Sequence, residues 1–159
     1  MNDDSALFDR VVAFVRDIGI AVTVGRVSDD TFLPSIAVRD GGLLIDRDRL
    51  LWPGDILHEA GHVAVTDPAA RPTLNVVPDE AGEELAAIAW SYAAARAIGI
   101  DSRILFHAQG YRGEGDWLVE TFDAGTYIGL PMLVWMGMAD DPASAPAGPA
   151  YPVMRRWLR

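Results

Sequence analysis

The sequence predicts a single α+β domain in which helices accompany a small antiparallel sheet. Residues 36–39 and 43–46 are short apolar runs joined by Asp40-Gly41-Gly42, which is a strong signal for a β-hairpin. Several longer stretches repeat apolar residues every three or four positions, as helices do. A chain of 159 residues, half of them apolar, is long enough to bury one core.

The first half of the chain is expected to contain a helix, a strand, the hairpin and a second helix. Ser5 is the expected N-cap of a first helix that ends at Gly19, and residues 20–24 follow as a strand. After the hairpin, the turn residues 52–55 lead into an apolar helix, which Asp67-Pro68 stops. The small sheet therefore precedes this helix directly in the chain.

The second half is expected to be helical up to a proline-rich end. An alanine-rich helix covers residues 79–98, and a further helix runs over 116–125. Residues 140–152 carry four prolines among alanines and are expected to be an extended linker, with 153–159 as a tail. We therefore expect one domain over 1–139, and a linker and tail over 140–159 that pack on it.

Charge argues against two classes of partner. Thirteen basic residues against 23 acidic ones give a net charge of −10, which disfavours binding to nucleic acid or to an anionic membrane surface. All the basic residues are arginines, a bias typical of a GC-rich bacterial genome. We expect neither nucleic acid nor membrane as a partner.

Three absences in the sequence bear on the expected compartment and on metal chemistry. The acidic N-terminus shows no secretion signal, and the longest apolar stretch, 127–138, is shorter than the roughly 20 residues of a membrane helix. We therefore expect a cytoplasmic protein. No cysteine is present, so a bound metal would have to be held by histidine and carboxylate groups.

The most informative motif is His58-Glu59-Ala60-Gly61-His62, an HExxH sequence. On a helix, positions i and i+4 share one face about 6 Å apart, so both imidazoles can reach one Zn²⁺ ion. Glu59 then lies beside the metal without binding it, where it can take a proton from a metal-activated water. We expect His58 and His62 to be zinc ligands and Glu59 to be the catalytic base.

A third protein ligand is needed for a catalytic zinc of this type. The metzincin pattern is excluded, because Val65 and Pro68 stand where its glycine and third histidine would be. The region of roughly residues 36–98 resembles a minimal gluzincin. It has a hairpin, an HExxH helix and a second helix that opens with a glutamate in an ExxA context. This resemblance implies a minimal zincin-like fold, a third ligand from the second helix, and zinc-dependent peptide hydrolysis.

Two glutamates fit the ExxA context, and helical geometry favours one of them. At about 100° per residue, Glu84 falls within the apolar sector of its helix, whereas Glu83 falls among alanines. A carboxylate in a buried sector needs a partner, and a metal ion supplies one. Glu84 is therefore the expected ligand and Glu83 the alternative.

Three further residues are possible alternatives for a role in the site. His107 is the remaining histidine and a rival ligand, and Tyr111 and Tyr127 are hydroxyl donors for a tetrahedral intermediate. The resemblance also implies that an extended peptide or protein substrate pairs with the strand at 43–46, as an edge strand. The leading hypothesis is a zinc metallopeptidase. The alternative is a non-catalytic zinc-containing module that binds a peptide or a protein.

Overall fold

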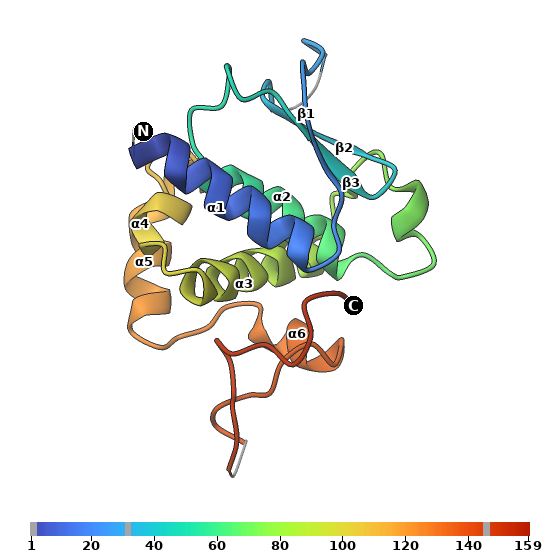
Figure 1. Ribbon diagram of the computed structural model, residues 1–159. Coiled ribbons are helices and arrows are strands. Elements are labelled where there is room, and N and C mark those ends of the chain that lie inside the picture. The colour runs from blue at the N-terminus through green and yellow to red at the C-terminus, as the bar shows by residue number, and fades with distance from the viewer. Residues whose placement is uncertain (1–2, 31–32, 145–146) are drawn as a thin grey trace.

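A computed structural model describes residues 3–30, 33–144 and 147–159, and it has mixed α and β structure, as predicted (Figure 1). The α-helices are α1 (Asp3–Asp17), α2 (Gly54–Val65), α3 (Ala81–Ala97), α4 (Ser102–Leu105), α5 (Gly115–Asp123) and α6 (Leu130–Trp135). The strands are β1 (Val22–Val24), β2 (Ile36–Arg39) and β3 (Gly42–Ile45), and the short 3-10 helices are η1 (Arg71–Thr73) and η2 (Tyr111–Gly113).

The predicted hairpin is confirmed. β2 and β3 pair antiparallel, with Val38 opposite Leu43. The two loop residues have positive φ angles, 47° at Asp40 and 71° at Gly41, as expected of a type I′ turn. Glycine is required at position 41 for two reasons: the φ angle is positive, and a Cβ there would lie 2.2 Å from the carbonyl oxygen of Arg71.

The prediction of an antiparallel sheet is wrong, because β1 pairs with β3 in parallel and makes the sheet mixed. The strand order is β1-β3-β2, so β3 lies in the middle. A hairpin signal fixes the direction of its own two strands only. The direction of β1 depends on where the connection between β1 and β2 carries the chain, and the local sequence does not encode that path.

The strand order also contradicts the expected role of residues 43–46. Both sides of β3 are already paired, to β1 and to β2, so β3 has no free edge for a peptide. The edges of this sheet are β1 and β2. Of these, β2 contacts α2, the helix that carries the HExxH motif.

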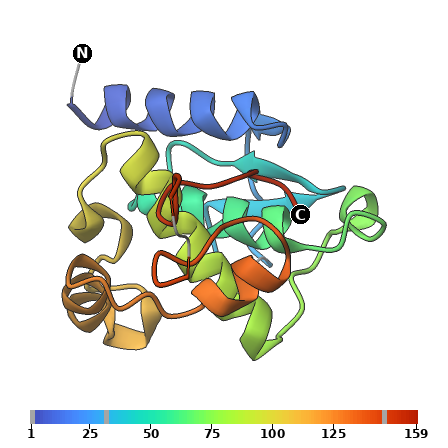
Figure 2. The ribbon, with the colours of Figure 1, turned by 90° about the horizontal axis from the view of Figure 1, so that it is seen from below.

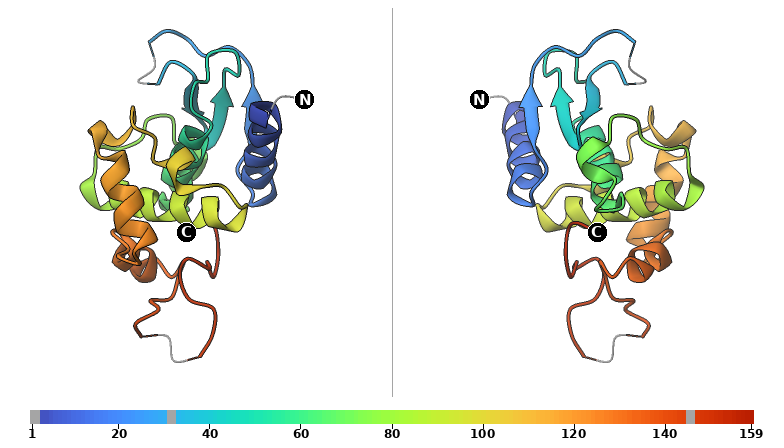
Figure 3. Two further views of the ribbon diagram at one scale, coloured as in Figure 1. Left: turned by 90° about the vertical axis from the view of Figure 1, so that its left-hand side faces the viewer. Right: turned by 90° about the vertical axis from the view of Figure 1, so that its right-hand side faces the viewer.

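Helices α2 and α3 form the centre of the molecule and make its most extensive contact between elements. Helix α1 lies on one side of this pair, whereas α5 and α6 lie on the other (Figure 3). The close approach of α2 to α3 depends on Gly61, where a Cβ would lie only 2.8 Å from the carbonyl oxygen of Ala87. Ten consecutive residues of α3 are buried, from Ala86 to Ala95.

The element boundaries differ from the predictions by a few residues. α1 already includes Asp3 and Asp4, so Ser5 is not its N-cap. α5 begins at Gly115 rather than after Asp116. The apolar stretch 127–138 contains the short helix α6, with Pro131 in its first turn, where a missing N–H costs no hydrogen bond. Among the described residues, no helix combines the length and apolar character needed to cross a bilayer.

The last residues of the chain contact the central helices (Figures 1 and 2). The indole of Trp90 donates a hydrogen bond to the carbonyl oxygen of Trp157 at 2.9 Å, and the amide of Arg159 donates to that of Ala64 at 3.0 Å. Residues 140–144 and 147–152 contain neither helix nor strand. The other two positions of the predicted linker, Ala145 and Pro146, lie outside the described residues.

Candidate metal centre

Helix α2 holds the two histidines one turn apart on the face toward α3. Their Nε2 atoms are 3.1 Å apart, and the two rings meet edge to face. The rest of the helix is largely apolar and buried, which fixes its orientation in the core. His58 keeps 17% of its side chain exposed and His62 only 6%.

The C-terminal end of α2 is fixed by polar contacts. The hydroxyl of Thr66 donates to the carbonyl oxygen of His62 at 2.7 Å. The guanidinium of Arg71 donates to the carbonyl oxygens of Val63, Ala64 and Thr66 at 3.0–3.2 Å, and to that of Arg159 at 2.8 Å. These bonds satisfy carbonyls that a helix end leaves without partners.

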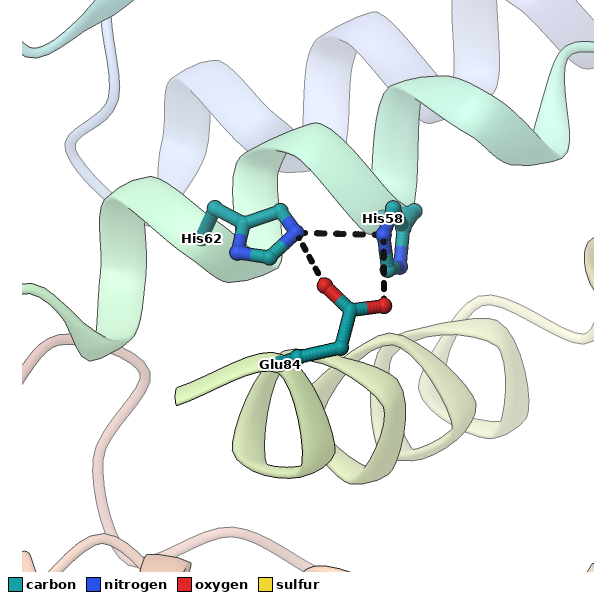
Figure 4. A group of neighbouring side chains, drawn as sticks. All are labelled: His58, His62 and Glu84. Carbon is teal, nitrogen blue, oxygen red and sulfur yellow. Dashed lines mark hydrogen bonds and ion pairs between the residues drawn. The ribbon is translucent and has the colours of Figure 1, made fainter. Parts of the chain in front are cut away.

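Helix α3 brings Glu84 to both histidines (Figure 4). One carboxylate oxygen lies 3.0 Å from His62 Nε2 and the other lies 3.4 Å from His58 Nε2. Of the two candidate glutamates, Glu84 joins the histidines and Glu83 is not part of the group. His58, His62 and Glu84 could therefore hold a metal ion, with one ligand atom from each within 4.8 Å of the others.

The electrostatics of the group favour the protonation states that bind metals. Burial, assisted by the neighbouring His62, lowers the pKa of His58 to about 4. The hydrogen bond with His62 lowers the pKa of Glu84, although burial opposes the shift. Near neutral pH the ring of His58 is thus neutral and the carboxylate is charged, as ligation requires. The Glu84 side chain is 45% exposed, so the group is open to solvent on the side of α3.

Glu59 lies beside the group without belonging to it. Burial raises the pKa of Glu59 to about 7, an effect that His62 opposes and the charges of Asp55 and Glu84 reinforce. A carboxylate with a pKa near neutrality can both accept and return a proton.

Tyr111 contacts the group from η2. Its ring meets the ring of His58 edge to face, with 5.2 Å between centroids. Its hydroxyl is buried and has no hydrogen-bond partner among the described residues. Ser91, whose hydroxyl donates to the carbonyl oxygen of Ile88, lies close enough to lower the pKa of the phenol. Burial raises the pKa of Tyr111, so the phenol keeps its proton and can act as a donor.

His107 and Tyr127 occupy other positions. His107 Nε2 lies 2.8 Å from a carboxylate oxygen of Asp55, and its ring stacks on Trp52 with 4.4 Å between centroids. His107 is therefore not part of the metal-binding group. Tyr127 packs in an aromatic cluster with Tyr92, Phe122 and Tyr151.

Two residues near the group were not expected from the sequence. Asp55 lies one turn before Glu59 on α2 and binds His107. Arg112 follows Tyr111 in η2, and its charge contributes to the low pKa of Glu84. The sequence did contain a signal for Asp55, because it lies four residues before Glu59 and so shares its face of the helix. Nothing in the local sequence singles out Arg112 from other exposed arginines.

Comparison of the chain with models of known protein families, with curated proteins and with solved structures finds no match. The residues of the site therefore carry the functional argument.

Proposed function

We propose that the protein is a zinc-dependent peptidase of minimal gluzincin type, with His58, His62 and Glu84 as the zinc ligands. The spacing of the donor atoms carries this proposal. Two ligand atoms bound tetrahedrally at about 2.0–2.1 Å from one Zn²⁺ ion are separated by about 3.3 Å. The two histidine Nε2 atoms are 3.1 Å apart, one carboxylate oxygen of Glu84 lies 3.0 Å from His62 Nε2, and the other oxygen lies 3.4 Å from His58 Nε2. With one ligand atom taken from each residue, the three atoms lie within 4.8 Å of one another. Two neutral imidazoles and one carboxylate form a ligand set used by catalytic zinc sites.

A bound Zn²⁺ would supply Lewis acidity to a water molecule and to the scissile carbonyl. The residues of the chain supply the proton transfers. Glu59 accepts a proton from the attacking water and then donates it to the leaving amine. Tyr111 supports the negative charge that develops on the carbonyl oxygen, because its buried hydroxyl is free to donate a hydrogen bond.

Replacement of Glu59 by glutamine tests the proposal. The Glu59→Gln variant keeps the shape of the side chain but loses the base, so zinc content stays unchanged while hydrolysis of a broad peptide library falls by about 10²–10⁴-fold. Glu83→Gln is the matched control, because Glu83 lies outside the group. It is expected to keep both zinc and activity.

One result would replace the peptidase by the non-catalytic alternative. If the zinc-loaded wild type cleaves no peptide in the library, yet it and Glu59→Gln bind peptides equally well, the protein is a zinc-containing binding module.

A further inference from the structure

A polar cavity lies where the C-terminal half of α3 meets α4, the end of α5 and the segment around Pro152. Its volume is about 440 Å³, within the roughly 300–1,000 Å³ of small-ligand sites. Two arginines, two aspartates and three hydroxyl side chains line it, so it suits a charged ligand better than an apolar one. The lining includes no residue of the metal-binding group, and Tyr92 lies about 12 Å along α3 from Glu84.

Buried hydroxyl groups orient the carboxylate of Asp123, one of the lining residues. The hydroxyl of Tyr92 donates to one carboxylate oxygen at 3.2 Å, and the hydroxyl of Ser102 donates to the other at 2.9 Å. Tyr92 and Ser102 are only 4% and 7% exposed, so packing fixes both donors. Each carboxylate oxygen has two lone-pair sites and can therefore accept a further hydrogen bond.

Asp123 and Arg96 are opposite charges that line one cavity without pairing. Among the described residues, the carboxylate of Asp123 makes no ion pair, and the guanidinium of Arg96 makes neither an ion pair nor a hydrogen bond. The other two charged lining residues engage each other. Asp101 accepts a hydrogen bond from the amide of Arg103 at 2.8 Å, and its carboxylate lies 3.8 Å from the Arg103 guanidinium. Arg96 and Asp123 are thus the charges left for a ligand.

We propose that this cavity binds a small zwitterion, with its ammonium group toward Asp123 and its carboxylate toward Arg96. An ammonium group has donors only, so it suits a carboxylate with free acceptor sites. A guanidinium fits a carboxylate through two parallel hydrogen bonds. Free α-amino acids and short peptides both carry this pair of groups, at different separations. The inference goes beyond the proposed peptidase and does not depend on the metal centre.

Titrations followed by the amide NMR signals of Tyr92 and Ser102 test the inference with small probes of defined charge. L-alanine and L-alanyl-L-alanine carry both charges, their N-acetyl forms lack the ammonium group, and their amides lack the carboxylate. We expect at least one zwitterion to shift these signals saturably and to bind about 3-fold or more tightly than both of its blocked forms, as for charge pairs at partly exposed sites. The tighter zwitterion shows whether the ligand is an amino acid or a peptide.

Two variants of the cavity should lose complementary parts of this preference. Arg96→Gln should no longer distinguish the acid from the amide, and Asp123→Asn should no longer distinguish the free amine from the N-acetyl form. Arg39→Gln on β2 and Asp9→Asn on α1 are the matched controls, because they remove the same charges outside the cavity. Both controls should keep both preferences.

Binding should also persist in His58→Ala, which removes a proposed metal ligand, so failure of the metal centre would leave this inference intact. Loss of binding in His58→Ala would place the probes at the metal-binding group and overturn the cavity assignment. Absence of saturable shifts with both zwitterions, equal binding of the blocked forms, or preferences unchanged in both cavity variants would overturn it as well.

Discussion

The contact between α2 and α3 yields a quantitative prediction at Gly61, inside the HExxH motif. A Cβ at this position would lie 2.8 Å from the carbonyl oxygen of Ala87, roughly 0.6 Å short of ordinary van der Waals contact, and 3.3 Å from an indole carbon of Trp90. The nearest obstacle is backbone in the middle of a helix, so the two helices must separate. Gly61→Ala gains about 1 kcal/mol in helix propensity, but overpacking of a core costs about 1–3 kcal/mol.

We therefore expect Gly61→Ala to lose up to about 2 kcal/mol of unfolding free energy, measured by urea denaturation of the metal-free protein. The variant should also bind zinc more weakly, because a separation of α3 from α2 moves Glu84 away from the two histidines. The matched control is Gly82→Ala on α3, where the added Cβ would meet only the flexible end of Met132 at 3.3 Å. This control should be neutral or more stable by up to about 1 kcal/mol. Equal stability of the two variants would refute the close-packing argument.

Three further predictions follow from other contacts. His58→Ala and His62→Ala should each abolish zinc binding, because a tetrahedral site cannot lose one of three protein ligands; metal retained in both variants by elemental analysis would contradict the HExxH assignment. Arg71→Met should lower the free energy of unfolding by about 1–3 kcal/mol, since it removes the guanidinium that donates to the carbonyls of Val63 and Thr66 at the end of α2; an unchanged denaturation midpoint would contradict this. Burial and the charge of Asp123 raise the pKa of Tyr92 from 10 to about 12. The stability that its neutral phenol contributes is therefore complete below pH 10 and is lost as the pH rises through 12. Phenolate absorbance during an alkaline titration should rise together with unfolding, and less steeply in Tyr92→Phe.

The parts of the site that follow from local periodicity could be predicted from the sequence. The i, i+4 spacing places His58 and His62 on one face of α2. The helical phase of α3 favours Glu84 over Glu83, and Glu84 is the glutamate that contacts both histidines. The Asp40-Gly41 turn is also local, because its two residues both tolerate positive φ.

Features that depend on long-range packing could not be predicted. The parallel pairing of β1 with β3 depends on the path of the chain between β1 and β2. Tyr111 and Arg112 have positive φ angles of 54° and 56°, and the ring of Tyr111 packs against the rings of Phe106 and His58, which are distant in the chain or in another element. Three glycines around these residues predict a loop, but they do not show which side chains the loop directs toward the site.

The central claim is that His58, His62 and Glu84 together bind one zinc ion. Competition with a chromophoric chelator measures the zinc affinity of the wild type, Glu84→Ala and Glu83→Ala under the same conditions. The two variants remove the same charge from adjacent positions of α3, so the comparison isolates ligation. We predict one zinc per chain, wild-type affinity in Glu83→Ala, and in Glu84→Ala a loss greater than the roughly 10–100-fold typical of a missing outer hydrogen bond to a ligand. Equal affinities in the two variants would contradict the assignment of Glu84 and the metal centre built on it.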